Sequence, residues 1–273
     1  MLVTGYYQPL FAGSLSRNKE FNIPVYGMPT DLVRLKDGRI GRWRDGRLRP
    51  YSTRAEIVAN GLPTAPVIAW MGDQVERFVA QVQGSAVLRM PDGSELGIGF
   101  AGKNGHVYRS IGAYLVKKGY MSRASVTMPA IIAFLARNPS LVREVLDYNP
   151  SFVFFRPSGT VPRGSLGTGL VPGRSVALDS GCFPAAAPLF LAGRLPYVDG
   201  SGRMVGSKPL RRIVFHHDSG SAIKGLFRLD LFLGRGDSAA ARAGVMRQSG
   251  ELYVLLPRKG DSGQEIVAAA ATD

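Results

Sequence analysis

The chain has 273 residues, of which 45% are hydrophobic, and its formal net charge is +14. The hydrophobic content indicates a globular protein, and the single Cys182 excludes an internal disulfide and any multi-cysteine metal site. No apolar run is long enough to span a bilayer, and the first residues lack the pattern of a signal peptide. The positive charge favours an anionic partner, for which nucleic acid, anionic lipid and acidic cell-wall polymer are all candidates.

Tight turns recur between short apolar runs along the chain. With 34 Gly and 18 Pro, and with Val, Phe and Tyr in short runs, the composition favours many short strands over long helices. The dipeptide Asp-Gly tolerates the positive φ of a two-residue hairpin turn. The sequence therefore predicts β-hairpins around Asp37-Gly38, Asp45-Gly46, Asp92-Gly93 and Asp199-Gly200.

The region most typical of helix runs from about residue 111 to 146. Ser125 is the expected N-cap of a helix that tolerates Pro129 in its first turn and ends at Asn138-Pro139. Ser140 is expected to cap a second helix, which continues through Leu146. Hydrophobic residues at helical spacing in the first of these helices are Met128, Ile131, Ile132 and Leu135.

After the helical region, residues 156–169 have turn-forming composition and no periodicity, so we interpret them as a linker at the main domain boundary. The tail from residue 266 is expected to be frayed. Between linker and tail the composition is again typical of strands, in the runs 175–178, 188–192, 211–215, 229–233 and 252–256. The sequence therefore predicts a mainly β protein with a few helices.

Three aspartates lie in apolar, glycine-punctuated frames. Asp218 follows a strand-forming run and enters a turn, Asp230 lies within a strand-forming run, and Asp179 follows another such run. A carboxylate in such a position costs several kcal/mol unless it is hydrogen-bonded, paired or kept protonated, and a protonated one can act as a general acid. The structural alternative is that each Asp caps a turn or pairs with Lys224 or Arg228.

These aspartates belong to a set of motifs that closely resembles the MltA-type membrane-bound lytic murein transglycosylases. The resemblance covers nearly the whole chain, and its motifs occur in the order typical of the family. Members of the family carry a substantial segment before the first motif, whereas this chain begins three residues before it. The matching blocks are 4–9, 24–27, 52–57, 81–85, 101–112, 149–155, 174–179, 218–225, 228–234 and 241–244.

The resemblance implies a mainly β fold with two domains. A double-psi β-barrel, the catalytic or 3D domain, would comprise residues 1–9 and 160–273. A second, smaller β-barrel with the helices of about 111–146 would be inserted as residues 10–159, and the glycan groove would lie between the two. The linker interpreted from composition agrees with that boundary.

The implied reaction cleaves the β-1,4 bond between N-acetylmuramic acid and N-acetylglucosamine in peptidoglycan and forms 1,6-anhydro-N-acetylmuramic acid. By motif position Asp230 matches the catalytic acid/base, and Asp218 and Asp179 match its supporting aspartates. The sugar-binding positions implied by the resemblance combine amides, hydroxyls and aromatic rings, which suit N-acetyl groups and pyranose faces. They are Thr4, Tyr6, Tyr7, Gln81, Gln83, Gly84, Ser85, Lys103, Asn104, Tyr108 and Arg109. Tyr6, Tyr7 and Tyr108 could instead be core aromatics.

The main alternative is a non-catalytic glycan-binding protein with the same fold. A Cys-His hydrolase lacks a signature around Cys182, and His216 with His217 cannot chelate a metal jointly because adjacent strand residues face opposite sides. We therefore expect no metal, no cofactor and no nucleic-acid partner. Peptidoglycan glycan strands are the expected partner, with other cell-wall enzymes open as further ones. The family resemblance implies a periplasmic, outer-membrane-associated location, although the chain shows no lipobox.

Overall fold

The computed structural model describes residues 1–123, 125–200, 202–220 and 222–256. The predicted frayed tail therefore lies outside the described residues. No helix in these ranges is both long and apolar enough to cross a bilayer. In chain order the elements are β1 (Leu2–Gln8), β2 (Leu10–Ser14), β3 (Ile23–Tyr26), β4 (Val33–Arg34), β5 (Ile40–Arg44), β6 (Arg47–Arg49), α1 (Arg54–Asn60), β7 (Val67–Met71), α2 (Gln74–Gln83), β8 (Ser85–Arg89), β9 (Glu95–Lys103), α3 (Ile111–Lys117), α4 (Met128–Arg137), η1 (Pro139–Leu141), α5 (Val142–Asp147), β10 (Val153–Ser158), β11 (Ser175–Ala177), β12 (Pro188–Val198), β13 (Met204–Asp218), β14 (Arg228–Arg235), α6 (Asp237–Val245), β15 (Arg247–Ser249) and β16 (Glu251–Val254).

The first strand belongs to a seven-stranded sheet whose other members all come from the C-terminal part of the chain. Its order is β15-β1-β14-β11-β13-β12-β16, with β1 parallel to β14 and β11 parallel to β13. Gly250 alone separates β15 from β16, the two edge strands, so the sheet is a nearly closed barrel. Alternate residues of β14, namely Leu229, Leu231 and Leu233, pack in the barrel core. The residues between them therefore face the other side of the sheet, and Asp230 is one of these.

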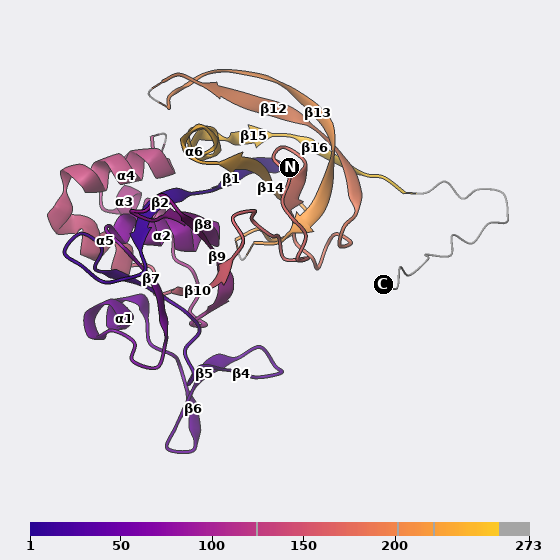
Figure 1. Ribbon diagram of the computed structural model, residues 1–273. Coiled ribbons are helices and arrows are strands. Elements are labelled where there is room, and N and C mark those ends of the chain that lie inside the picture. Colours follow the sequence, from indigo (N-terminus) through magenta and orange to yellow (C-terminus); the bar gives the residue numbers. More distant parts are fainter. Residues whose placement is uncertain (124, 201, 221, 257–273) are drawn as a thin grey trace.

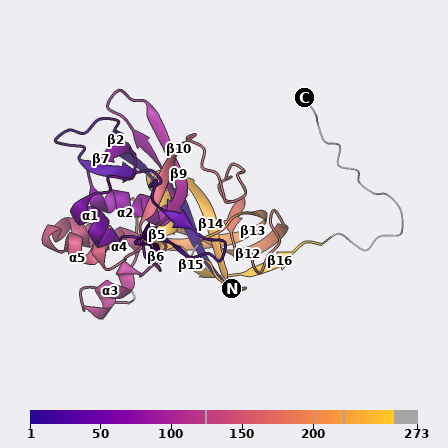
Figure 2. The same cartoon turned by 90° about the horizontal axis from the view of Figure 1, so that it is seen from below.

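A second sheet begins at Leu10, two residues after β1 ends. Its order is β10-β9-β8-β2-β7-β3, and β10 also approaches β3, so this sheet curls toward closure. Figures 1 and 2 show helices α1 to α5 on the side of this sheet, whereas α6 lies against the barrel. Helix α2 also reaches the barrel, because its Val79 packs in the barrel core. The mainly β fold with an additional smaller β unit is confirmed.

The chain passes between the sheets twice, at Pro9 and again after β10 ends at Ser158. Residues 159–174 contain no strand apart from an isolated bridge between Arg163 and Gly169, as a linker requires. We propose that residues 1–9 with 160–273 form one domain and that residues 10–159 form the inserted one. Sheet membership supports this division.

All four predicted hairpins are confirmed. The Asp-Gly turns join β4 to β5, β5 to β6, β8 to β9 and β12 to β13, and each pair is antiparallel. At the second turn both Asp45 (φ 51°) and Gly46 (φ 68°) are left-handed, as a type I′ turn requires. The local chemistry of these turns is therefore sufficient to locate the hairpins.

The helical region contains α3, α4, η1 and α5, but both predicted caps are wrong. Helix α4 begins at Met128, so the N-cap position falls on Thr127, whose hydroxyl accepts a hydrogen bond from the Ala130 amide (3.3 Å). Ser140 lies inside η1, and α5 begins without a side-chain cap. Pro129 is in the first turn and α4 ends before Asn138, as predicted.

Candidate functional site

The two aspartates of the 218–230 segment lie on strands β14 and β13, on either side of β11. In the sheet register Asp230 pairs with Thr4 of β1 on one side and with Ala177 of β11 on the other. Ala177 also pairs with Asp218 at the end of β13, next to a register shift. Both carboxylates therefore flank one short central strand, although their own strands are not adjacent.

Asp230 sits in surroundings that favour its protonated form. The residue is half-buried, but its Oδ1 is inaccessible to solvent and has no hydrogen-bond partner among the described residues. Burial raises the pKa of Asp230 from 3.8 to about 6, and the charge of Asp218 also raises it, against the opposing effects of the Thr4 hydroxyl and of Arg228. Such a carboxyl group can donate a proton near neutral pH.

Asp218 is held by three donors. The Ser219 and Ser165 amides donate to its Oδ1 (2.8 and 2.9 Å), and the Tyr6 hydroxyl donates to its Oδ2 (3.0 Å). Burial nevertheless raises the pKa of Asp218, while the three hydrogen bonds act against the rise. The Tyr6 ring also lies 5.3 Å from that of Phe232, so Tyr6 joins Asp218 to β14.

Asp179 has a different role from the other two aspartates. Its Oδ2 accepts the Gly225 amide (2.8 Å), its Oδ1 accepts the Gly181 amide (3.2 Å), and Lys224 Nζ lies 3.6 Å from Oδ1. These amides, that of Gly225 above all, lower the pKa of Asp179, so it stays ionised. Asp179 thus fixes the turn between Asp218 and Asp230 to its own loop, and for this aspartate the structural alternative of pairing with Lys224 is found.

Replacing Asp179 by Ala should loosen this turn, because the Gly225 and Gly181 amides would both lose their acceptor. We expect faster hydrogen exchange at these two amides in the folded protein, measured by mass spectrometry of peptides that span them. Exchange in the β8–β9 hairpin, which Asp179 does not touch, serves as the internal control. Unchanged exchange at Gly225 would show that the carboxylate does not hold the turn.

Of the predicted sugar-binding residues, Thr4 and Tyr6 lie beside the aspartates. Tyr7 instead packs in the barrel core, where burial raises the pKa of its hydroxyl to about 12. Its amide donates to Gln83 Oε1 (3.2 Å), which attaches the end of α2 to β1. Gln83 is therefore close to the acid-bearing sheet, and the ring of Tyr7 is a structural element.

The amides of Gln81 and Asn104 are used inside the protein. Gln81 is 5% exposed, accepts from Arg54 (2.6 Å) and donates to the Val153 carbonyl (2.9 Å). Asn104 is 1% exposed, and its Nδ2 donates to the Ser52 and Pro150 carbonyls (2.9 and 2.8 Å). A sugar could not reach these amides without displacing existing bonds, so both hold the loops behind the surface.

The remaining predicted positions lie on or near the surface of the second unit. Gly84 is the left-handed C-cap of α2 (φ 78°), and no atom lies within 4 Å of where its Cβ would be. Lys103 ends β9 half-buried, and Tyr108 and Arg109 are exposed in the following loop. Among the described residues, no hydrogen bond or ion pair joins Lys103, Tyr108 or Arg109 to the three aspartates. Ser85 begins β8 next to Gly84.

Sequence reasoning missed the residues that act through the backbone or through strand order. Ser165 belongs to the linker, yet its amide binds Asp218 from 53 residues away. The hydroxyl of buried Ser175 forms a hydrogen bond with His217 Nδ1 (3.0 Å) and accepts one from the Val171 amide (2.9 Å). His216 Nδ1 contacts the Pro184 carbonyl (2.9 Å). No residue-type pattern in the sequence announces these contacts.

An open cavity of about 510 Å³ lies at the far end of β1 and β14 from Asp230. Leu10 and Phe11 of β2, Met90 beside the β8–β9 turn, and Asp237 at the start of α6 are among its lining residues. It is separate from the aspartates, because Asp230 is near the start of β14 and the cavity is beyond its end.

Together, the fold and the site define a class of protein. This class has two β units that are joined through the first strand, and it has a buried aspartate on the barrel sheet that can be protonated. The model of the MltA specific insert domain matches residues 2–156, and that of the 3D domain matches residues 174–256. The chain belongs to the MltA family.

Relatives agree with this assignment. The chain is 36% identical over 260 residues to membrane-bound lytic murein transglycosylase A of Escherichia coli K12; the match covers 94% of this chain and 66% of that protein. A membrane-bound lytic murein transglycosylase structure from Agrobacterium tumefaciens superposes with a TM-score of 0.84 at 32% identity, covering 94% of this chain and 74% of the other. Escherichia coli MltA with bound chitohexaose superposes with a TM-score of 0.76 at 34% identity, covering 92% and 70%.

Proposed function

We propose that this chain is a peptidoglycan lytic transglycosylase that cleaves the β-1,4 bond between N-acetylmuramic acid and N-acetylglucosamine and leaves a 1,6-anhydro ring on the muramic acid. The observation that carries the proposal is the unpaired, buried Oδ1 of Asp230, whose pKa is raised to about 6. Relatives named lytic murein transglycosylase A and a neighbour with bound chitohexaose support the reaction class and a glycan substrate.

One carboxyl group is sufficient for both proton transfers. Protonated Asp230 would donate its proton to the glycosidic oxygen as the bond from that oxygen to C1 of the muramic acid breaks. The resulting carboxylate would then take the proton of the C6 hydroxyl as that oxygen bonds to C1. The proton returns to Asp230 and no water is consumed, unlike hydrolysis by two carboxylates.

The neighbouring residues have supporting roles in this proposal. Asp218, with its charge near Asp230, helps to keep the acid protonated between turnovers, and Tyr6 orients Asp218 through its hydroxyl. Thr4 lies beside Asp230, and its hydroxyl favours the carboxylate that forms after proton donation. Asp179 positions the turn that connects the two acids.

Glycan binding is proposed for the predicted positions whose side chains or backbone remain accessible. These are Thr4, Tyr6, Gln83, Gly84, Ser85, Lys103, Tyr108 and Arg109. Peptidoglycan glycan strands are the proposed partner. The proposed location is next to the outer membrane, and the name of the membrane-bound relatives supports association with a membrane. Tyr7, Gln81 and Asn104 act behind this surface.

The pH dependence of turnover should report the pKa of Asp230. The acid must be protonated to begin the reaction, so kcat/KM should fall as pH rises above about 6 and approach a tenfold loss per pH unit. Initial rates on soluble glycan strands between pH 5 and 9 would measure this decrease of kcat/KM with rising pH. A rate that stays constant up to pH 8 would assign the proton to another group.

Product analysis tests the reaction itself. Purified sacculi digested with the chain should release muropeptides with anhydro ends, which are 18 Da lighter than the corresponding reducing-end products of hydrolysis because no water is added. Mass spectrometry separates the two outcomes. Reducing-end products would establish a hydrolase, and glycan binding by a folded chain without any product would establish the non-catalytic alternative.

A further inference from the structure

A strongly basic three-stranded sheet formed by β4, β5 and β6 projects from the body of the protein. Figure 1 shows it extending away from both larger sheets, and in Figure 2, seen from below, it lies in front of the body. Residues 34–49 contain seven Arg and Lys and two Asp, a net charge of +5 out of +14 for the chain. The projection thus concentrates about a third of the net charge in 16 residues.

The β5–β6 hairpin places like charges opposite each other. Arg42 pairs with Arg49 and Arg44 pairs with Arg47, so four arginines share one face. Paired residues are about 5 Å apart and successive pairs about 7 Å apart along the strands, and like charges at such distances destabilise a hairpin. Within the part of the chain that the structure describes, Arg44, Arg47 and Arg49 are exposed and make no ion pair.

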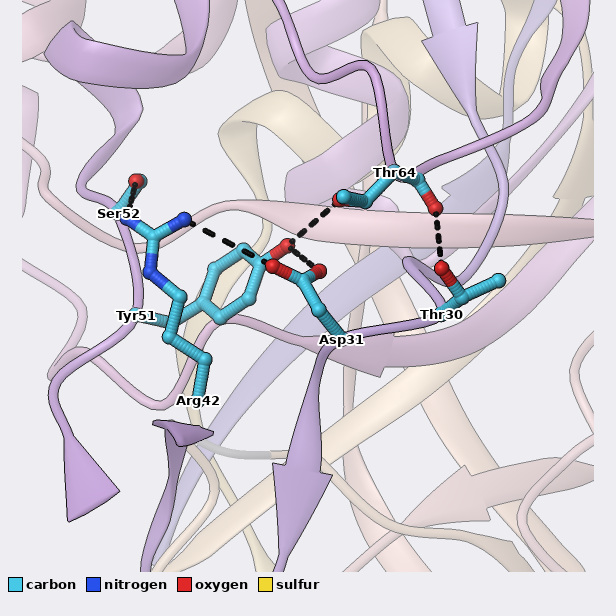
Figure 3. Close-up of polar contacts among 6 residues, drawn as sticks. All are labelled: Thr30, Asp31, Arg42, Tyr51, Ser52 and Thr64. Carbon is cyan, nitrogen blue, oxygen red and sulfur yellow. Dashed lines mark hydrogen bonds and ion pairs between the residues drawn. The ribbon is translucent and has the colours of Figure 1, made fainter. Parts of the chain in front are cut away.

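The base of the projection is held firmly by polar contacts, which Figure 3 shows. Arg42 donates to Ser52 Oγ (2.8 Å), lies 3.7 Å from Asp31 and packs over the Tyr51 ring at 5.1 Å. The Tyr51 hydroxyl donates to Asp31 (2.7 Å), and Thr30 bonds the Thr64 carbonyl (3.2 Å). One arginine of the face therefore anchors the hairpin, while the other three are exposed and form no ion pair among the described residues.

The opposite face of the hairpin is apolar. Trp43 pairs with Leu48 across the strands, and Trp43 is 57% exposed. Because successive residues of a strand point to opposite faces, Trp43 lies on the side of the hairpin away from the four arginines.

We propose that the arginine face of the β5–β6 hairpin docks this protein onto an anionic lipid bilayer, with Arg44, Arg47 and Arg49 on headgroup phosphates. Guanidinium groups this closely spaced require a dense array of anions, which a leaflet of anionic lipids supplies. A glycan strand has neutral sugars and only the carboxylates of its stem peptides, so it matches this density poorly. The anionic headgroups of the bilayer also offset the electrostatic repulsion between the paired arginines of the hairpin.

Vesicle binding tests the proposal. Wild type should co-sediment with vesicles of phosphatidylglycerol and phosphatidylcholine at low salt, bind pure phosphatidylcholine far less, and dissociate at high salt. The variant Arg44→Glu/Arg47→Glu/Arg49→Glu should lose at least about tenfold in partition coefficient, since each basic residue contributes separately.

A matched variant distinguishes an effect of the hairpin on vesicle binding from an effect of the protein's net charge. Lys19→Glu/Arg123→Glu/Arg137→Glu removes the same charge from exposed sites elsewhere and should bind vesicles within about twofold of wild type. Both variants should cleave soluble glycan to anhydro products at the wild-type rate. This result would show that they are folded and that docking is distinct from the proposed reaction. The proposal is overturned if both variants lose binding equally, if wild type ignores anionic vesicles, or if the hairpin variant loses adhesion to lipid-free sacculi instead.

Discussion

Replacement of Asp230 by Asn should lower the release of anhydro-muropeptides from sacculi by about 10²- to 10⁴-fold, the range associated with loss of a general acid–base group. Asn has nearly the same shape but cannot transfer a proton, so the effect should fall on kcat, with KM little changed. Rates from single-turnover digestion of soluble glycan, measured at pH 5.5 where wild-type Asp230 is largely protonated, give the comparison.

The same variant should be more stable than wild type at pH 8, which distinguishes lost chemistry from lost folding. A carboxyl group whose folded pKa is raised from 3.8 to about 6 destabilises the folded state increasingly as pH rises through that interval. Asn does not ionise, so the free energy of unfolding at pH 8 should rise by up to about 3 kcal/mol. Urea unfolding at pH 4 and pH 8 measures this difference.

A matched control is Asp37→Asn, in an exposed hairpin turn far from the site, which should leave activity unchanged. If Asp230→Asn retains wild-type turnover, the acid is another group, and Asp218, whose pKa is also raised by burial, is the next candidate. If activity and stability fall together at pH 8, the substitution has disturbed the fold and the assignment loses its support.

Local chemistry made the hairpins and the acid-bearing strands predictable. An Asp-Gly pair between strand-forming runs specifies its turn regardless of what surrounds it, and all four such turns are hairpins. Asp230 was identified from its apolar frame and the family motifs, and the structure adds the cause of its raised pKa, which is burial. Asp179 and Asp218 have similar frames in sequence but opposite pKa directions.

Non-local arrangement was not predictable from the residues alone. Strand β14 lies between β1 and β11, and its pairing with β1 joins residues more than 200 positions apart in the sequence. This placement decides which side chains surround Asp230. Helix α2 was missed, because its polar sequence packs through Phe78, Val79 and Ala80. Gln81 and Asn104 have the chemistry of sugar ligands, and only burial shows that their amides are already bonded.

A second large effect is expected from Arg54→Met, which should lower the free energy of unfolding by about 3–5 kcal/mol, because each buried acceptor left unpaired costs about 1–3 kcal/mol. Arg54 is 2% exposed and donates to Gln81 Oε1 (2.6 Å) and to the carbonyls of Asn149 (3.2 Å) and Ser151 (2.7 Å). Burial, then the charge of Arg77, lowers the pKa of Arg54 to about 9, so it remains charged at neutral pH. Methionine would fill the space but leave three buried acceptors unpaired. Exposed Arg123→Met should change stability by less than about 0.5 kcal/mol.

A double-mutant cycle of Arg54→Met with Gln81→Met separates a structural role of Gln81 from a glycan-binding one. If the Arg54–Gln81 hydrogen bond holds α1 to α2, Gln81→Met alone should be destabilising, and the double variant should lose less than the sum of the two by about 1 kcal/mol or more. Denaturant unfolding measures the coupling, and kinetics on soluble glycan supply an independent readout. If the two changes in unfolding free energy are additive and Gln81→Met raises KM, Gln81 binds glycan instead. Its 5% exposure and its two internal hydrogen bonds argue against that outcome.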